Sequence, residues 1–215
     1  MLEIVSYTAK GPVPECLTAV LARHAGVPPE VEETVARVLA AVRLRGDEAV
    51  AEFTREFDEV SMTPDQFRVP KSALEEAARS ADPDLMAAIK EAAANIGAFH
   101  QRQISNSWFM EDGDGVILVK KVTPIDRVGI CVPGGQAPLI SSLLMAGVPA
   151  QVAGVAEICV VTPPTSMGLP HADILATAHF LGIDEVYAIG GAQAVAAIAF
   201  GTQSVRPVDK IVGPG

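Results

Sequence analysis

The chain has 215 residues, of which 49% are hydrophobic and 20% are charged, a balance typical of a globular protein with one large domain or two small ones. Its formal net charge of −10 argues against a surface built to bind nucleic-acid phosphates or anionic lipids, and we expect neither as a partner. The three cysteines, Cys16, Cys131 and Cys159, are widely spaced and form no C-x-x-C pair, which favours the reducing cytoplasm over a disulfide-forming compartment.

The first long helix is predicted from Pro28 to Gly46. Apolar residues recur there at helical spacing, namely Val31, Val35, Val38, Leu39 and Val42. Gly46 is a typical helix-ending residue, and we expect Asp47 to cap the helix that follows. The apolar stripe of this following helix consists of Val50, Phe53 and Phe57.

Two further helices are predicted over residues 71–80 and 83–103. Asp82 is placed to cap the second of them, because an aspartate before a first-turn proline is a common helix start. Pro83 would then occupy the first helical position, where its missing N–H costs nothing.

A β-hairpin is predicted next, with strands at 108–110 and 116–119 joined by the turn D-G-D-G. Trp108 lies in its first strand. A lone aromatic residue beside a hairpin is more often a packing residue than a platform for a ligand, and we expect packing here.

The second half of the sequence, after Thr123-Pro124, alternates strands with helices. The predicted order is strand 127–132, helix 138–154, strand 157–162, helix 170–181, strand 185–189, helix 192–200 and a strand that begins at 210. This alternation implies a parallel sheet with right-handed crossovers. We therefore expect an α/β protein with a mostly helical region over 1–124, which includes the hairpin, and a Rossmann-like βαβ region over 125–215.

The segment 143–161 is apolar enough to resemble a membrane span. Pro149, Gln151 and Glu157 interrupt it, however, and a change from helix to strand is the better interpretation. We expect no association with a membrane.

Glycine pairs follow two of the predicted strands. Pro133-Gly134-Gly135 ends the first strand, and Gly190-Gly191 ends the third and opens the helix that carries Gln193. Parallel sheets bind ligands at the carboxyl ends of their strands, where glycines admit a ligand to the backbone and helix amides favour phosphate. Neither turn matches the dinucleotide-binding pattern G-x-G-x-x-G. At this point a ligand-binding role and a purely structural role in tight turns are equally good interpretations of these glycines.

No pattern in the sequence predicts a metal site or a nucleophile. The four histidines form no H-x-x-x-H pair and are interpreted as solvated or core residues: His24, His100, His171 and His179. Cys131 ends a strand at the predicted cleft, but no histidine lies nearby in sequence to activate it. We interpret this cysteine as a small buried hydrophobic residue.

Four segments of the chain resemble the histidinol dehydrogenase family. They are RGDEAVAEFTREFD at 45–58, RVGICVPGG at 127–135 with APL at 137–139, GGAQAVAAIAFGT at 190–202 and VDKIVGPG at 208–215. Members of this family are cytoplasmic, zinc-dependent oxidoreductases of histidine biosynthesis, which oxidise L-histidinol through the aldehyde to L-histidine and reduce two NAD. They are intertwined homodimers with folds that resemble incomplete Rossmann domains. The resemblance implies this fold, activity, substrate, cofactor set and assembly.

The resemblance also assigns roles to residues. The family's NAD-contacting glutamine falls on Gln193, and its NAD-contacting tyrosine falls on Cys131, a departure that removes an aromatic face and a hydroxyl from the site. Together with the glycine turns, the implied cofactor-binding residues are Cys131, Pro133, Gly134, Gly135, Gly190, Gly191 and Gln193. A third NAD contact, an asparagine, would follow Gly215, as would the catalytic glutamate–histidine pair and the zinc ligands. The resemblance therefore implies no catalytic and no metal-binding residue within these positions.

Three hypotheses follow. The first is an amino-terminal fragment of a histidinol dehydrogenase that is inactive alone. The second is a related dehydrogenase that acts on another alcohol. The third is a non-catalytic nucleotide-binding or assembly module that pairs with another subunit through an exposed sheet edge and helices.

Overall fold

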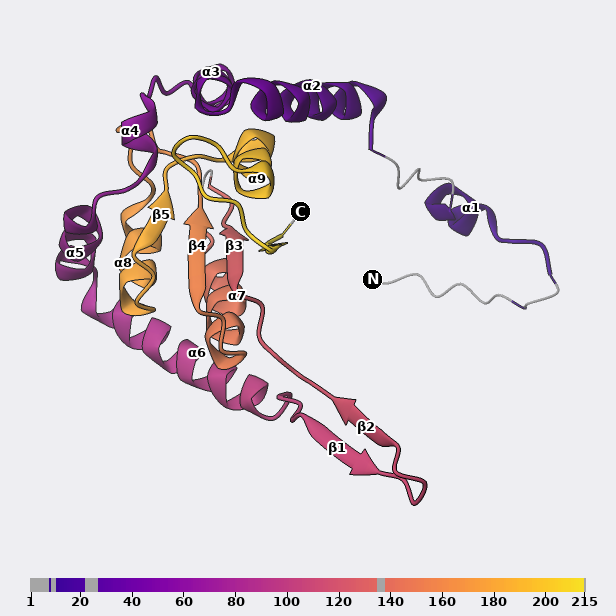
Figure 1. The fold of residues 1–215 in the computed structure, drawn as a ribbon. Helices are drawn as coiled ribbons and strands as arrows, with labels where there is room; N and C mark the ends of the chain where they lie inside the picture. Colours follow the sequence, from indigo (N-terminus) through magenta and orange to yellow (C-terminus); the bar gives the residue numbers. More distant parts are fainter. Residues whose placement is uncertain (1–7, 9–10, 22–26, 135–137, 215) are drawn as a thin grey trace. The chain divides into compact units, whose positions relative to one another are not determined.

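The computed structural model describes residues 8, 11–21, 27–134 and 138–214 (Figure 1). The chain divides into two compact units, residues 1–36 and 37–215. The first unit contains α1 (Glu15–Leu21), a short helix that the sequence analysis did not predict, and the beginning of α2 (Pro29–Arg45).

The predicted amino-terminal helices are confirmed, with differences at their ends. The second unit continues α2 and adds α3 (Asp47–Asp58), α4 (Pro64–Phe67), α5 (Lys71–Ser80) and α6 (Pro83–Gln101). Asp82 caps α6 as predicted, because its side chain accepts a hydrogen bond from the Asp84 amide at 2.8 Å. The one-turn helix α4 was not predicted, since four residues are too few to establish a helical period.

The predicted role of Asp47 as a helix cap is wrong. Gly46 occupies the capping position, and Asp47 is the first residue of α3. The buried Asp47 carboxylate instead accepts a hydrogen bond from the Ser204 hydroxyl, and its amide donates to the Gln203 side chain at 2.9 Å. A long-range partner has therefore replaced the local cap and fixes the start of α3 to the chain after α9 (Gly191–Phe200).

The predicted apolar stripes are only partly buried. Val38 and Val42 of α2 lie in the core, as do Val50 and Phe53 of α3. Leu39 is partly buried, and the remaining members of the two stripes are exposed, namely Val31, Val35 and Phe57.

The predicted hairpin is present, with β1 (Trp108–Glu111) antiparallel to β2 (Ile117–Lys120). Every residue of both strands is exposed, so the hairpin presents apolar side chains on both of its faces. Trp108 is 50% exposed, so it packs only in part against the rest of the chain, and its predicted role as a packing residue stays a prediction.

The predicted parallel sheet is confirmed. Its elements are β3 (Arg127–Cys131), α7 (Ile140–Val152), β4 (Glu157–Val161), α8 (Ala172–Phe180), β5 (Glu185–Tyr187), α9 and β6 (Lys210–Val212). Among the described residues the strands are ordered β5-β4-β3-β6, and each neighbouring pair is parallel. The segment suspected of resembling a membrane span is α7 followed by β4. Within the described part of the chain, no helix is both long enough and apolar enough to cross a membrane.

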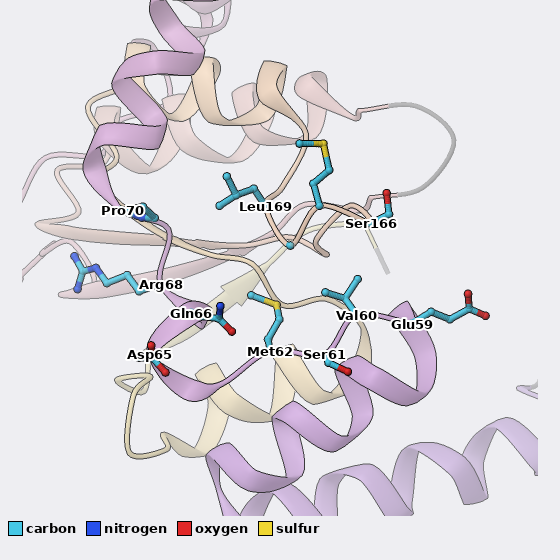
Figure 2. Close-up of a pocket in the computed structure, with 12 residues that line it drawn as sticks. Glu59, Val60, Ser61, Met62, Asp65, Gln66, Arg68, Pro70, Ser166 and Leu169 are labelled. Atoms are coloured by element: carbon cyan, nitrogen blue, oxygen red, sulfur yellow. The ribbon is translucent and has the colours of Figure 1, made fainter.

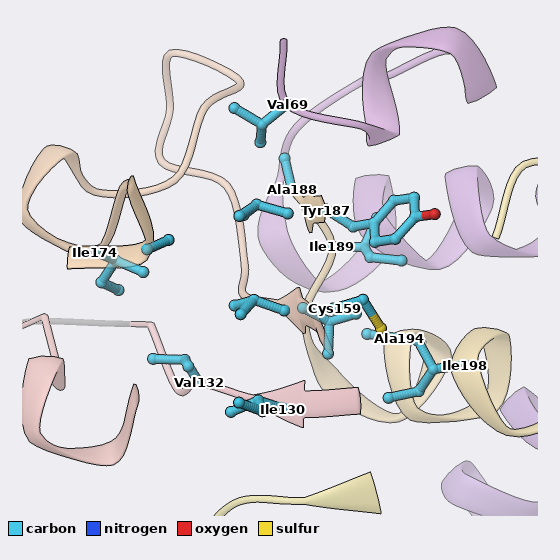
Figure 3. Close-up of a cluster of buried hydrophobic side chains, with 14 of the residues drawn as sticks. Val69, Ile130, Val132, Cys159, Ile174, Tyr187, Ala188, Ile189, Ala194 and Ile198 are labelled. Carbon is cyan, nitrogen blue, oxygen red and sulfur yellow. The ribbon is translucent and has the colours of Figure 1, made fainter. Parts of the chain in front are cut away.

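Helices cover both faces of the sheet. A Cβ built on Gly129 of β3 would lie 2.8 Å from the Ile198 side chain of α9, whereas one built on Gly147 of α7 would meet the Ile130 side chain. Neighbouring strand residues point to opposite faces, so α7 and α9 lie on opposite sides of β3. Figure 3 shows the resulting core, in which Ala194 and Ile198 lie beside Cys159.

The edge of the sheet at β5 is covered by the segment that follows α4. The amide of Val69 donates to the Val186 carbonyl at 2.8 Å, and the amide of Ala188 donates to the Phe67 carbonyl at 2.7 Å. Arg68 and Tyr187 form an antiparallel bridge. This pairing joins the helical region to the sheet.

A buried arginine connects the amino-terminal ends of three strands. The Arg127 guanidinium on β3 donates to Glu157 on β4 at 2.7 Å and to Glu185 on β5 at 2.6 Å. The hydroxyl of Tyr187 also donates to Glu185, at 2.7 Å. Because the strands are parallel, this ionic cluster lies at the end of the sheet opposite the glycine turns.

Candidate functional site

The strand order reverses beside β3. The chain passes from β3 to β4 and β5 on one side, and then returns to place β6 on the other side of β3. Such a reversal opens a crevice at the carboxyl ends of the two flanking strands, where open α/β sheets bind their ligands. At this end the turn after β6 lies directly against β3, because a Cβ built on Gly213 would come 2.4 Å from the Cys131 carbonyl oxygen.

The two glycine turns singled out from the sequence meet around one proline. A Cβ built on Gly134 would lie 2.2 Å from Cγ of Pro163, and one built on Gly190 would lie 2.6 Å from its Cβ. Pro163 lies two residues after the end of β4, the strand between β3 and β5, so both turns lie at the same end of the sheet. Gly135, also predicted for the site, lies outside the described residues.

Gln193 occupies the first turn of α9 and is fully buried, with 0% of its surface exposed. Its side-chain amide donates to the Asp58 carboxylate at 3.3 Å, and Asp58 is the last residue of α3. The other side-chain atom, Oε1, has no hydrogen-bond partner among the described residues. In this arrangement Gln193 lies behind Asp58 and does not itself face the solvent.

A cavity of about 340 Å³ opens at this end of the sheet. Its polar groups come from Asp58, Thr162, Thr165 and His171, and its apolar wall from Pro138, Pro163, Pro164 and Ile174. Gly134 completes the lining. The volume lies within the range of about 300 to 1,000 Å³ that is usual for small-molecule sites.

Two of these polar groups have unusual surroundings. Thr162 is 1% exposed, and its hydroxyl has no hydrogen-bond partner among the described residues. Burial raises the pKa of the Asp58 carboxyl above its ordinary value. Thr162 is therefore a buried group whose hydrogen bonds the described residues do not complete, and Asp58 is a carboxyl whose charged form is disfavoured by burial.

The predicted site residues divide into two groups. Gly134 lines the cavity, whereas Pro133, Gly190, Gly191 and Gln193 are not among its lining residues. Gly190 packs against Pro163, Gln193 contacts Asp58, and Gly191 is exposed. Cys131 is half-buried at the end of β3, and burial raises the pKa of its thiol, which disfavours the reactive thiolate.

Sequence reasoning missed Asp58 and Thr162. Thr162 ends a predicted strand just before Pro163-Pro164, the same kind of strand end as the glycine turns, so its position was available from the sequence. Asp58 lies 135 residues from Gln193 along the chain, and no local spacing indicates that contact.

A second cavity, of about 570 Å³, lies between the segment after α3 and the loop before α8 (Figure 2). Met62, Leu169 and Arg68 are among its lining residues. None of its lining residues was singled out from the sequence. Across the described ranges, no three side chains of the metal-ligating types His, Cys, Asp and Glu gather closely enough to hold a metal ion.

Comparisons with known proteins agree on one family. A family model described as histidinol dehydrogenase matches residues 21–215. The histidinol dehydrogenase of Syntrophotalea carbinolica is 48% identical over 203 residues, which is 93% of this chain and 46% of the relative. That of Nitratidesulfovibrio vulgaris is 50% identical over 188 residues, 86% of this chain and 43% of the relative.

A solved structure is also similar. The crystal structure of histidinol dehydrogenase from Elizabethkingia anophelis aligns with a TM-score of 0.85 at 35% sequence identity, over 95% of this chain and 47% of that one. The chain therefore spans about half the length of the curated relatives that it matches.

Proposed function

The chain belongs to the histidinol dehydrogenase family of oxidoreductases, and on this basis we propose that it is the NAD-binding, amino-terminal part of an enzyme that oxidises L-histidinol to L-histidine. The observation that carries this proposal is the cavity at the carboxyl ends of β3 and β4, whose lining includes Thr162, a buried residue with a hydroxyl that has no partner among the described residues. Residues 125–215 would form most of this site, and the mostly helical part, residues 1–124, would contribute Asp58 to its lining.

NAD suits the groups gathered at this end of the sheet. Bound there, the cofactor would accept the hydride that leaves the substrate carbon. The residues proposed to hold it are those that the resemblance implies: Cys131, Pro133, Gly134, Gly135, Gly190, Gly191 and Gln193. The first turn of α9 has no acidic residue and no side-chain cap, so its free amides can receive the cofactor phosphates.

Zinc does not suit the described residues, because they contain no cluster of metal ligands. We propose that the zinc ligands and the base that removes the alcohol proton come from polypeptide corresponding to the part of the relatives that this chain does not span. Without a base and a Lewis acid, the 215-residue chain alone would not turn over L-histidinol.

The proposed assembly is a homodimer in the cytoplasm, as the resemblance implies. The free state of the described cysteines is consistent with a reducing compartment. Membranes and nucleic acids are not proposed as partners, given the net charge of −10.

A chimera tests the proposal. This chain would replace the matched amino-terminal part of the Syntrophotalea carbinolica enzyme, to which it is 48% identical. We expect the chimera to reduce NAD with L-histidinol, and the 215-residue chain alone to show no NAD reduction. Full activity of the chain alone, or a folded chimera that oxidises a different alcohol but not L-histidinol, would contradict the proposal.

A further inference from the structure

The strongest unassigned feature of the molecule is the pair of polar groups in the cavity beside Pro163. Among the described residues, only Gln193 donates a hydrogen bond to the Asp58 carboxylate, and it does so to Oδ2. The second carboxylate oxygen, Oδ1, is therefore left to accept a hydrogen bond from a ligand. A carboxylate at this position favours a ligand that donates hydrogen bonds and disfavours a phosphate, because two like charges repel.

Thr162 supplies the second group. Its buried hydroxyl can both donate and accept a hydrogen bond, and the described residues provide a partner for neither. A buried polar group without a partner destabilises the folded state, so its retention beside a cavity indicates a ligand that completes its hydrogen bonds. The matching ligand group is a hydroxyl, because a hydroxyl can also donate one hydrogen bond and accept another.

The walls limit the shape of the ligand. Pro138, Pro163 and Pro164 are rigid and apolar, and Ile174 closes the same wall. The cavity thus favours a compact, uncharged group that carries neighbouring hydroxyls. Any charged phosphates would lie outside the cavity, and the uncapped start of α9 offers the amides that bind them.

Resting on the proposed function, we propose that Asp58 and Thr162 bind the hydroxyl pair of a ribose of the dinucleotide. Asp58 accepts from one hydroxyl while Gln193 holds the carboxylate in place, and Thr162 exchanges a hydrogen bond with the other. Gln193 is then a positioning residue, which explains why its side chain is buried behind Asp58.

Binding to the 215-residue chain tests this assignment without any need for catalysis. The thermal shift on titration with NAD gives the dissociation constant. Asp58→Asn keeps the size of the side chain and an oxygen for the Gln193 amide, but removes the charge. We expect it to weaken NAD binding about 10- to 100-fold, the range for a hydrogen bond to a charged group.

Thr162→Val gives a second, independent signal. Valine matches the shape of threonine and removes the unpartnered hydroxyl, so the ligand-free protein should melt at a higher temperature. The same variant should bind NAD more weakly. A threonine with only a structural role would not move these two quantities in opposite directions.

Asp65→Asn is the matched control, because Asp65 is an exposed aspartate of α4 that does not line this cavity. It should bind NAD as the unmodified chain does. NADP distinguishes the two riboses of the cofactor, since its additional phosphate lies on the adenosine ribose. If the chain binds NAD but not NADP, the ribose in the cavity is the adenosine ribose. If it binds NADP as tightly as NAD, the ribose in the cavity is the nicotinamide ribose.

The outcomes separate this proposal from the proposed function. If NAD stabilises the unmodified chain and both variants equally, the ribose assignment is wrong and NAD binding stands. If NAD fails to stabilise even the unmodified chain, both are overturned. A loss of binding in Asp65→Asn as large as that in Asp58→Asn would attribute the effect to net charge and overturn the assignment.

Discussion

At the scale of single residues, burial separates the three cysteines. Cys16 is exposed, Cys131 is half-buried with a raised pKa, and Cys159 is fully buried. For Cys159, burial outweighs the nearby Arg127 charge and raises the pKa to about 12. The thiolate is the reactive form, so these differences predict an order of reactivity.

We expect iodoacetamide at about pH 8 to label Cys16 first, Cys131 more slowly and Cys159 only after unfolding. Peptide mass spectrometry of a labelling time course would measure the three rates. A Cys131 that reacts as fast as Cys16 would contradict its interpretation as a buried hydrophobic residue and restore the alternative of a nucleophile.

Arg127 provides the second prediction at this scale. Burial by itself would raise the pKa of Glu185, but hydrogen bonds from Arg127 and Tyr187 outweigh it and lower the pKa. Replacing Arg127 by Met would leave the half-buried Glu185 without its cation, and should lower the free energy of unfolding by about 3 kcal/mol or more.

The loss should depend on pH. A carboxyl whose pKa is lowered by folding stabilises the protein above its ordinary pKa, and this contribution disappears as the pH falls through the folded value. The difference in free energy of unfolding between the unmodified chain and Arg127→Met should therefore be largest near neutral pH and become smaller below about pH 4. Urea denaturation at both pH values measures it, and a difference that grows in acid would contradict the ionic origin.

The residue scale also shows what local sequence could not predict. The buried contact between Asp58 and Gln193 joins two helices that are 135 residues apart, and periodicity within either helix says nothing about it. The same holds for Asp47, whose sequence context favours a cap but whose actual partner is Ser204. Long-range packing overrides a local preference worth only about 1 kcal/mol.

At the scale of elements, prediction from the sequence was much more complete. The order of strands and helices after Pro124 was predictable because each element has its own hydrophobic period and is bounded by glycine or proline. The third strand of the sheet ends at Tyr187, two residues before its predicted end at Ile189, where the chain already bends toward the Gly190 turn. The sequence also predicted that the glycine turns share one end of the sheet, but not that Pro163 lies between them.

The contact with Pro163 makes the size of residue 190 critical. Gly190 has an extended backbone that any residue adopts, so only crowding opposes a side chain there. A Cβ would lie 2.6 Å from the Pro163 Cβ and 3.0 Å from its backbone Cα. Gly190→Ala should therefore destabilise the protein by about 1 to 3 kcal/mol, as overpacking does.

Gly113→Ala is the control, since a Cβ there meets nothing within 4 Å. Chemical denaturation should show a lower midpoint for Gly190→Ala and an unchanged one for Gly113→Ala. Equal midpoints for the two variants would mean that Pro163 moves freely, and the close packing of the two turns would not be needed for stability.

At the scale of the whole molecule, the hairpin of β1 and β2 is the largest departure from expectation. Phe109 and Val119 face each other across the ladder and are 78% and 66% exposed. A two-stranded ribbon is marginally stable by itself in water, and exposed apolar patches mark interaction sites. We expect this ribbon to associate with a second copy of the chain.

The double variant Phe109→Thr with Val119→Thr keeps residues that favour strands and removes the apolar surface. It should shift the purified chain toward the monomer in size-exclusion chromatography with light scattering. The variant Glu111→Thr with Lys120→Thr changes polar positions of the same strands and should leave the distribution as it was. If Phe109→Thr with Val119→Thr leaves the share of monomer unchanged, the hairpin is not the surface through which two copies of the chain associate.

The anchoring of α3 has a consequence for how the protein is made. Asp47, at the start of that helix, is 157 residues from its partner Ser204. A ribosome that adds about 5 to 20 residues per second needs roughly 8 to 31 s to cover that distance. During this interval the apolar side of α3, including Phe53, has left the ribosome before α9 exists to cover it. The amino-terminal helices therefore cannot complete their native packing until the last part of the sheet has been made.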